Sequence, residues 1–380
     1  MDRKAASEAS AQISHLAKVC LVVGAVAGGL TTDLAHAAGT NPNVVHGNVT
    51  FETRGNKTII RAGDGSIINY LNFNIAPGEI VRFIQPGEAS RVLNRITGGE
   101  ASIIAGTLRA NGHVYFVNPA GVFFNNGAVV SVNGLHAAAG SLSNANFLAG
   151  ADRFKNLTGS VVNDGSITGN RVDLVGKHVA NHGQIETPRG ILTMVAGNDV
   201  LIMENGGHIS VKIKGTKLTD QNAPQAGGTT PDMSADPGVE NTGTLKAGHG
   251  QIMLGAGDMY ALAVRNSGTI NASGGGSITV AGKDGLIQNT AGAVISADVA
   301  NGQAGEVVVQ GPSVVNSGSI TADSDNGRAG YVEVTSQNHT YLTDGSVVSA
   351  SGGDGFARGG EVLIHSYDGS TVASTDATIS

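Results

Sequence analysis

The sequence is very poor in cysteine. Its 380 residues contain one, Cys20, which lies in the N-terminal leader described below, so the remaining chain has none. Disulfide bonds and cysteine-based metal sites are therefore excluded from the mature chain. The lack of thiols is compatible with export through an oxidising compartment and does not by itself indicate a cytoplasmic protein.

Charge, tryptophan and long apolar runs are also scarce. Charged residues make up only 14% of the chain, the net charge is −7, and Trp is absent. An acidic chain without basic patches excludes nucleic acid as a natural partner. No segment outside the leader has about 18 apolar residues in a row, so no transmembrane helix is predicted. Motifs for zinc, nucleotide or serine-hydrolase chemistry are missing, and we predict no metal and no cofactor.

Glycine is abundant instead. The 57 Gly residues alternate with short runs of Val, Ile, Thr and Asn. Hydrophobic residues at 40% argue against disorder. Short β-branched runs separated by Gly are typical of strands joined by tight turns, so an all-β fold without long helices is predicted.

Residues 1–37 are predicted to be a cleavable signal peptide. A basic start precedes the apolar segment Val19 to Leu30, which is too short to span a bilayer. A small-x-small pattern ends at Ala37, which places cleavage before Ala38. The alternative is an amphipathic start to a cytoplasmic domain.

The stretch from Ser90 to Val122 organises the chain. Two apolar runs, Ser102–Ala105 and His113–Val117, are bounded by Gly-Gly and Asn-Gly and indicate strands. The second run ends in the tetrapeptide 118–121, Asn-Pro-Ala-Gly. Proline pushes the preceding Asn out of the helical region and Gly can adopt a positive φ, so a tight turn is predicted there.

These motifs resemble the secretion module of two-partner secreted proteins, the filamentous-haemagglutinin-type adhesins. The family pattern is S-x-V-L-N-R-V-T-G-G, then S-x-I-x-G-x-L-x-A-N-G, then N-P-N-G-I. Here the three motifs appear in order as Ser90–Gly99, Ser102–Gly112 and Asn118–Val122, with Ala120 for Asn and Val122 for Ile. The first motif is similar to that of large surface adhesins and haem-acquisition proteins. The clear resemblance covers about Asn43 to Phe154.

The resemblance implies a partner and a set of motif residues. In this family the N-terminal module addresses the chain to a dedicated outer-membrane transporter, whose periplasmic domains bind it. Two roles stay open for the motif residues, which either contact the transporter or hold the turns that make the module recognisable. The resemblance carries these roles to Asn94, Arg95, Asn118, Pro119, Ala120, Gly121 and Val122.

From Val161 onward the sequence repeats a unit of Asn-x-Gly-x-Ile type. Within a unit, a second and a third short strand follow Gly turns, which describes one coil of a parallel β-helix. We therefore predict a right-handed parallel β-helix with N-terminal capping strands. Asp344 starts a degenerate copy, for which a weaker coil is expected. The other units begin at Asn163, Asn181, Asn205, Asn241, Asn266, Asn289 and Asn316.

Two interpretations remain open for the recurrent Asn. Stacked side-chain amides can hydrogen-bond up and down as a ladder, which is favourable only if every amide finds partners. Alternatively, Asn suits the conformation of the turn.

Three domains are predicted. The signal peptide occupies residues 1–37, the secretion and haemagglutination module residues 38–160, and the β-helix repeats residues 161–380. A polar, proline-containing stretch at about 212–240 is expected to leave the coil as an exposed, mobile excursion. A short helical turn is expected at 144–149.

Three acidic residues are candidates for catalysis or for Ca²⁺ binding. Asp199, Asp258 and Asp284 each follow a Gly turn, where stacked acids could bind Ca²⁺ or catalyse. The favoured interpretation is that Asp suits the turn. Five histidines fall beside predicted turns and are expected to be solvated: His113, His136, His178, His182 and His249.

The sequence thus favours a secreted exoprotein of a two-partner system over an enzyme. Its N-terminal module would direct export through the periplasm and an outer-membrane transporter of a Gram-negative-type bacterium. The β-helix would act as an adhesin-like or haemagglutinin-like surface passenger, with host or neighbouring-cell glycans or proteins as ligands. The alternative is a polysaccharide-active β-helix enzyme. The chain stops at Ser380 within repeat-like sequence and without a recognisable closing cap, as a fragment of a longer protein would.

Overall fold

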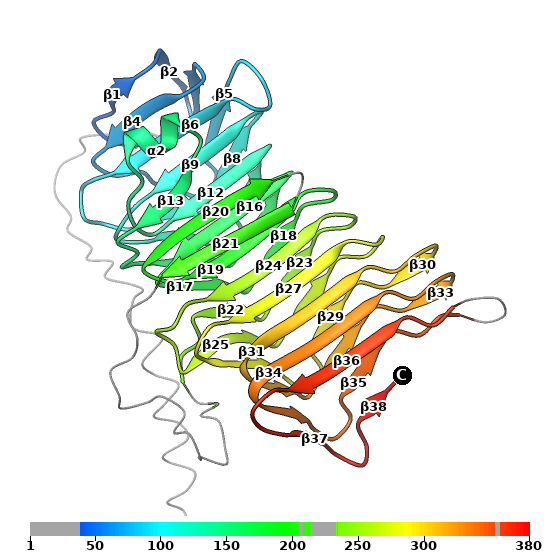
Figure 1. The fold of residues 1–380 in the computed structure, drawn as a ribbon. Coiled ribbons are helices and arrows are strands. Elements are labelled where there is room, and N and C mark those ends of the chain that lie inside the picture. Colours follow the sequence, from blue (N-terminus) through cyan, green and yellow to red (C-terminus); the bar gives the residue numbers. More distant parts are fainter. Residues whose placement is uncertain (1–38, 206–207, 215–232, 234, 354–357) are drawn as a thin grey trace, which may run out of the picture. The chain divides into compact units, whose positions relative to one another are not determined.

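The computed structural model describes residues 39–205, 208–214, 233, 235–353 and 358–380 (Figure 1). The predicted signal peptide and its cleavage site at Ala37 and Ala38 lie outside these residues. The predicted helical turn is present as α2 (Asn144–Leu148), capped by the Ser143 side chain, which accepts a hydrogen bond from the Asn146 N–H. No helix in the described ranges is long and apolar enough to cross a membrane.

The strands form two long sheets and two small ones. The 20-stranded sheet contains β1 (Asn43–His46), β4 (Ser66–Tyr70), β6 (Arg91–Ile96), β7 (Ser102–Ile104), β9 (His113–Val117), β10 (Val122–Phe124), β12 (Gly134–Ala138), β14 (Ser160–Asn163), β16 (Arg171–Gly176), β17 (His178–Asn181), β19 (Ile191–Ala196), β22 (Val239–Asn241), β24 (Gln251–Ala256), β25 (Leu262–Asn266), β27 (Ser277–Gly282), β28 (Leu286–Asn289), β31 (Glu306–Asn316), β34 (Tyr331–Leu342), β36 (Glu361–Ser366) and β37 (Thr371–Ala373). The 13-stranded sheet contains β2 (Val49–Arg54), β3 (Lys57–Ala62), β5 (Ile80–Ile84), β8 (Thr107–Ala110), β11 (Val129–Ser131), β15 (Ser166–Thr168), β18 (Gln184–Glu186), β23 (Thr244–Lys246), β26 (Thr269–Asn271), β29 (Val294–Ser296), β32 (Ser319–Thr321), β35 (Val347–Ser349) and β38 (Thr378–Ile379). The small sheets consist of β13 (Asp152–Lys155), β20 (Asp199–Asn205) and β21 (His208–Lys214), and of β30 (Val299–Asn301) and β33 (Ser324–Asn326).

Each coil contributes three strands that pair in parallel with the same strands of the next coil. In one coil, β16, β17 and β18 are joined by short turns at Lys177 and at His182–Gly183. They pair with β19, β22 and β23 of the following coil. Figure 1 shows these strands running side by side from one coil to the next. The predicted parallel β-helix is confirmed.

The core lies inside the coil and is built from stacked aliphatic side chains. A strand of one coil cannot bury its inner face alone, so burial comes from the coils above and below. One column shows this in the 13-stranded sheet, where each member pairs in register with the next and is at most 1% exposed. It runs through Ile167, Ile185, Leu245, Ile270, Ile295, Ile320 and Val348.

Antiparallel strands close the N-terminal end of the coil. β1 pairs antiparallel with β4, and β2 pairs antiparallel with β3, as the capping prediction requires. Residues Leu71–Ile75 alternate apolar and Asn residues, a pattern that predicts a strand, and this prediction is wrong. The segment is irregular and forms only isolated bridges, with Phe73 and Ile75 buried and Leu71 46% exposed.

The excursion from the coil begins earlier than predicted. Residues Asp199–Ile202 follow a Gly turn and have the apolar composition of a third coil strand, but they lie in β20, which pairs antiparallel with β13 and β21. The excursion therefore includes a folded hairpin from Asp199 to Lys214, while residues 215–232 lie outside the described residues. Burial explains the difference, because Val200 and Ile202 pack with Phe154 on the outer face of the coil.

Candidate functional site

The Asn118 turn is held by the Asn118 side chain. This side chain is 1% exposed, and its Nδ2 donates to the Glu100 carbonyl oxygen at 2.9 Å and to Ser102 Oγ at 3.0 Å. Its Oδ1 accepts from the Ala120 N–H at 3.0 Å. The amide thus ties the end of β9 to the start of β7. Its donor and its acceptor both find hydrogen-bond partners in this buried turn.

Gly121 completes the turn. Its φ of 120° is rarely adopted by residues with a side chain, and a Cβ there would lie 3.0 Å from the Ser160 carbonyl oxygen. Val122 then begins β10 as a fully buried residue. Pro119 and Ala120 are the exposed members of the turn. The buried and exposed positions of one motif therefore have different physical tasks.

Asn94 and Arg95 lie on β6, which pairs with β9 so that Arg95 is in register with Val117, next to the turn. Asn94 is fully buried, and its Nδ2 donates to the Tyr115 carbonyl oxygen at 3.1 Å. Arg95 Nη2 donates to the Leu142 carbonyl oxygen at 2.8 Å and to Asn144 Oδ1 at 2.7 Å. The structure thus brings the two motifs together and ties them to the segment that leads into α2.

The recurrent asparagines form a continuous hydrogen-bonded row. Each Nδ2 donates to the next Oδ1 at 2.8 Å from Asn163 to Asn181, Asn241, Asn266, Asn289 and Asn316. The same Nδ2 groups also contact carbonyl oxygens within the turn, as Asn163 does with Gly165 at 3.2 Å. The structure therefore contains both arrangements considered above, the ladder and the turn.

Two expectations about this row are corrected. Asn205 is not a rung, because its backbone lies in β20 of the hairpin and Asn181 donates directly to Asn241. Asp344 is not the equivalent of Asn either, since Asn316 pairs in register with the buried Leu342. Leu cannot accept a hydrogen bond, so the ladder ends at Asn316.

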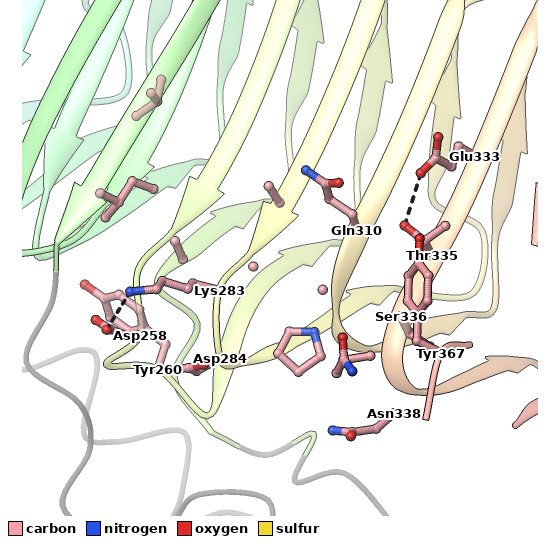
Figure 2. Close-up of a pocket in the computed structure, with 18 of the residues that line it drawn as sticks. Asp258, Tyr260, Lys283, Asp284, Gln310, Glu333, Thr335, Ser336, Asn338 and Tyr367 are labelled. Atoms are coloured by element: carbon pink, nitrogen blue, oxygen red, sulfur yellow. Dashed lines mark hydrogen bonds and ion pairs between the residues drawn. The ribbon is translucent and has the colours of Figure 1, made fainter. Parts of the chain in front are cut away.

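The three acidic residues considered for catalysis do not lie together, and two of them are in separate ion pairs. Asp199 pairs with Arg153 at 2.8 Å, on the small sheet outside the coil. Asp258 pairs with Lys283 at 2.9 Å, and Asp284 lies nearby at the rim of a groove (Figure 2). Because Asp199 does not line that groove, the three acids do not form one carboxylate cluster.

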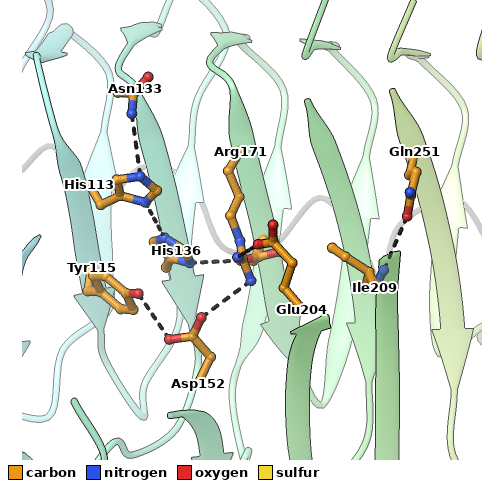
Figure 3. Close-up of polar contacts among 10 residues, drawn as sticks. His113, Tyr115, Asn133, His136, Asp152, Arg171, Glu204, Ile209 and Gln251 are labelled. Atoms are coloured by element: carbon orange, nitrogen blue, oxygen red, sulfur yellow. Dashed lines mark hydrogen bonds and ion pairs between the residues drawn. The ribbon is translucent and has the colours of Figure 1, made fainter. Parts of the chain in front are cut away.

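A buried polar cluster lies between the coil and the small sheet, and the sequence reasoning missed it (Figure 3). His136, expected to be solvated, is 1% exposed, and its Nδ1 lies 2.7 Å from Asp173 Oδ2. Arg171 Nε donates to the same Asp173 oxygen at 2.8 Å, and Arg171 also pairs with Asp152 at 3.3 Å. The outward-facing positions of β12 and β16 carried no signal of this burial, because β13 and β20, distant in sequence, cover them.

Hydrogen-bond contacts link two histidines to Asn133. Asn133 Nδ2 lies 3.4 Å from His113 Nε2, and His113 Nδ1 lies 3.0 Å from His136 Nε2. Which ring nitrogen donates in each contact is set by the tautomer of the imidazole. Burial, followed by the nearby His136, lowers the pKa of His113 to about 4. The His113 ring is therefore neutral at neutral pH.

The carboxylate of Asp173 is the fixed charge of this cluster. Burial alone would raise its pKa, but Arg171 and His136 together hold it well below the ordinary value. Burial and the neighbouring Asp152 raise the pKa of Tyr115, which donates its hydroxyl to Asp152 at 3.0 Å. The cluster joins β9, β12 and β16 of the coil to β13 of the small sheet.

A divalent metal ion does not fit this cluster well. His136, Asp152 and Asp173 offer three ligand atoms within 4.8 Å of one another. The Arg171 guanidinium, however, already contacts both carboxylates, and a metal ion there would face its positive charge at close range. The donor set therefore suits an arginine-centred ion-pair network.

The three other histidines that were expected to be solvated, His178, His182 and His249, lie outside the buried cluster. His182 is 41% exposed in its side chain, and its Nδ1 lies 2.7 Å from Asp164 Oδ1. The Glu240 carboxylate, 3.9 Å from His182 Nε2, raises the pKa of His182 to about 9, and Asp164 adds to the effect. His178 Nδ1 contacts the Pro237 carbonyl oxygen at 3.2 Å, and His249 is exposed.

Two curated relatives are similar to parts of this chain. The Heme/hemopexin-binding protein of Haemophilus influenzae strain ATCC 51907 / DSM 11121 / KW20 / Rd is 32% identical over 219 residues, which are 54% of this chain and 22% of that protein. A second Heme/hemopexin-binding protein of Haemophilus influenzae is 43% identical over 95 residues, 24% of this chain and 10% of the relative. The chain thus matches about a fifth or less of the length of these relatives.

The crystal structure of the HMW1 secretion domain from Haemophilus influenzae superposes with a TM-score of 0.69 at 24% identity. The match covers 90% of this chain and 99% of that structure, and it supports the fold. The family profile of the TPS secretion domain matches residues 35–294. Because this match covers more than half of the sequence and includes all three motifs, the chain belongs to the TPS secretion domain family.

Proposed function

We propose that this chain is an exoprotein of a two-partner secretion system. Residues 38–160 would direct export through an outer-membrane transporter, and the β-helix of residues 161–380 would be the surface passenger. The match of the TPS secretion domain family to residues 35–294 carries this proposal. The coil itself runs on past residue 160, since β10 pairs in register with β14.

The burial of the motif supports a structural role for most of its residues. Asn94, Asn118 and Gly121 are inaccessible in the folded protein. A transporter can touch these residues only before folding. In the folded coil, Asn118 and Gly121 would build the turn, and Asn94 would tie β6 to β9. Folding at the cell surface would then bias transport outward, with the first coils acting as a template for later ones. Pro119 and Ala120 remain available for direct contact.

Export with a matched transporter tests both roles. Asn118→Ala leaves the Ser102 hydroxyl and the Glu100 carbonyl without their partner, and Gly121→Val forces a side chain onto a positive φ. We expect both variants to lose most of their export, measured as protein in the culture medium. Pro119→Ala tests direct contact, because this residue is exposed in the same turn, and a loss of export there would favour contact with the transporter. Asn301→Ala, at an exposed position of β30 outside the motif, is the control and is expected to be exported normally. Undiminished export of Asn118→Ala and Gly121→Val would remove the motif from the mechanism.

The proposed location is the cell surface, reached through the periplasm. The transporter's periplasmic domains are the proposed partner inside the cell envelope, and surface glycans or proteins of host or neighbouring cells are the proposed ligands outside. Protease accessibility on intact cells tests the location, with a transporter-deficient strain as the control. Chain that stays protected in the transporter-bearing strain would contradict the proposal.

The names of the relatives favour a second candidate function. Both are called Heme/hemopexin-binding proteins, so we propose haem or hemopexin binding for the exported protein. A titration of the mature chain with haem, followed by absorbance, and a hemopexin pull-down test it. The absence of both kinds of binding would reject this function for residues 38–380.

A further inference from the structure

β21 is one of the two edge strands of the small sheet outside the coil. The strand order is β13–β20–β21, and among the described residues β21 pairs with β20 alone, whereas the β13 edge forms a bridge between Ser141 and Lys155. The Ile209 N–H points away from β20, because it donates to Gln251 Oε1 on β24 at 3.2 Å (Figure 3). Main-chain groups along a strand alternate in direction, so the N–H groups of Val211 and Ile213 point to the same open edge. Within the described residues, no hydrogen bond reaches these two groups.

A groove of about 950 Å³ lies beside this edge (Figure 2). The side chains of Val211 and Ile213 form one wall, and Met253, Ala256 and Ala281 contribute to the floor. β21 lies over part of β24, where Ile213 packs above Gly255. The rest of the floor is the outer face of β27, β31 and β34, and the lining also includes the charged residues Lys283, Asp284 and Glu333. The groove is therefore the direct continuation of the space that β20 and β21 already fill.

Register shows that the floor suits a further strand. The outward position occupied by Val175 on β16 and Val195 on β19 is buried under the small sheet. The same position becomes Gly255 on β24, which Ile213 of β21 already covers, and Ala281 on β27. The small side chain of Ala281 lets another main chain approach the coil beside β21.

The charge of the edge indicates the partner's composition. Lys212 and Lys214 are exposed on the outer side of β21. Arg153 and Lys155 lie on β13 across the sheet, where Asp199 is the carboxylate in register with Lys155 and Lys214. Four cations against one acid make the outer face of the small sheet positive in a chain of net charge −7, whereas the groove itself is lined by Lys283 and the acids Asp258, Asp284 and Glu333. A strand with acidic side chains toward solvent and apolar side chains toward the floor is complementary to it.

We propose that the open edge of β21 and the groove beside it are a docking site for an extended, acidic strand of a partner protein. The strand adds to the small sheet as its fourth member. Its main chain pairs with Val211 and Ile213, its apolar side chains cover Met253 and Ala281, and its acidic side chains pair with Lys212 and Lys214. Strand addition of this kind takes affinity from main-chain hydrogen bonds and specificity from alternate side chains.

The probe is a synthetic peptide of the length of β21, with alternating Glu and Val and blocked ends, titrated onto the mature chain by fluorescence anisotropy. We expect saturable binding, together with slower amide hydrogen exchange at Val211 and Ile213. The same peptide with N-methylated Val residues cannot donate from those positions and is expected not to bind. No saturable binding, equal binding of the N-methylated peptide, or protection confined to another surface would overturn the proposal.

Two protein variants separate strand addition from simple charge attraction. The double variant Lys212→Glu, Lys214→Glu is expected to weaken binding of the Glu–Val peptide by at least about fivefold and to gain binding of a Lys–Val peptide. The control is Lys246→Glu, an exposed lysine at the end of β23 in the 13-stranded sheet, with no effect expected. An equal loss in the control would contradict the proposal.

The third variant, Val211→Pro, removes one outward-pointing N–H. An edge strand tolerates proline at such a position because the N–H is not used within the sheet. We expect loss of peptide binding with an unchanged circular dichroism spectrum. Unchanged peptide affinity in this variant would exclude main-chain pairing at Val211. Saturable binding of a neutral oligosaccharide, in place of the peptide, would reassign the groove to a sugar ligand and end the proposal.

Discussion

The outer face of the 20-stranded sheet has a covered half and an open half. From β9 to β19, side chains on this face lie under α2 and the small sheet, and Val175 and Val195 are fully buried there. From β24 to β34 the same face borders the groove, and its equivalent side chains, such as Ala281 and Val308, are partly exposed. The inner face is alike in both halves, since the aliphatic columns continue through all coils.

The difference teaches that an outward position in a β-helix has no fixed burial. In one register column, Tyr115, His136 and Asp173 are buried in the covered half, while Thr279 and Glu333 occupy the open half at the rim of the groove or beside it. Burying charge required Arg171 as compensation in the covered half. In the open half, solvent does this at little cost.

The largest expected loss of stability comes from a substitution in the buried polar cluster. Arg171→Ala leaves Asp173 fully buried and Asp152 nearly so, without their cation, and we expect a loss of about 3–5 kcal/mol in the free energy of unfolding. Guanidinium-induced unfolding measures it. The comparison in the open half is Lys283→Ala, which removes a 57% exposed cation from the single, 8% exposed carboxylate of Asp258. We expect a smaller loss of about 1–2 kcal/mol, because only one buried carboxylate loses its partner there. Equal losses would show that the two halves do not differ electrostatically.

The ladder is the feature that both halves share, and Asn241 lies in its middle. Asn241→Ala removes the acceptor of Asn181 and the donor to Asn266, and all three side chains are buried. We expect a loss of about 1–3 kcal/mol in unfolding free energy. Asn301→Ala, at an exposed position, is the control and should change stability by less than about 0.5 kcal/mol. An unchanged unfolding free energy of Asn241→Ala would mean that the turn alone explains why Asn recurs along the ladder.

A pair of identical substitutions compares packing in the two halves. Val195→Ala removes atoms from the buried contact with Val200 and Ile202, and we expect a loss of about 2 kcal/mol. Val308→Ala, at a partly exposed outward position of β31, should cost less than about 1 kcal/mol. Thermal unfolding of both variants gives the comparison. A larger loss for Val308→Ala would show that something covers the open half in solution.

The smallest expected effect is a pH dependence of the covered half. The pKa of His113 is lowered to about 4, chiefly by burial, whereas the unfolded chain takes up this proton near the ordinary value of 6.5. The folded state therefore loses stability as the pH falls from 6.5 toward 4. The loss from Asp173 begins only below its ordinary pKa of 3.8. Unfolding free energies between pH 7 and 4.5 measure the slope, which should be flatter in His113→Gln.

Much of the fold was predictable because its signals are local. Gly turns, alternating runs and the Asn-x-Gly-x-Ile unit each act within a few residues, and they placed the strands around Ile191, Ile278 and Val307 correctly. The turn at Asn118 and Gly121 was equally readable, since proline and glycine restrict or extend φ by themselves. The helical turn at α2 follows from the Ser143 cap.

The misplaced features depend on contacts between distant segments. Asp199–Ile202 has the composition of a coil strand, and only pairing with β13 decides that it leaves the coil. Asn205 repeats the local motif, yet its strand faces β21 and the ladder passes it by. His136 stands beside a turn, and the small sheet above it, not its neighbours in sequence, makes it buried.

The sequence by itself determined that this chain winds into stacked coils with asparagine at one register, because strand, turn and repeat preferences are properties of short segments. The tertiary structure alone decided which outward side chains are buried. Covering one half of the outer face requires β13, β20 and β21, which are separated along the chain, to meet over β12, β16 and β19. That meeting created the buried network around Arg171 and left the edge of β21 open, and no local pattern specifies either.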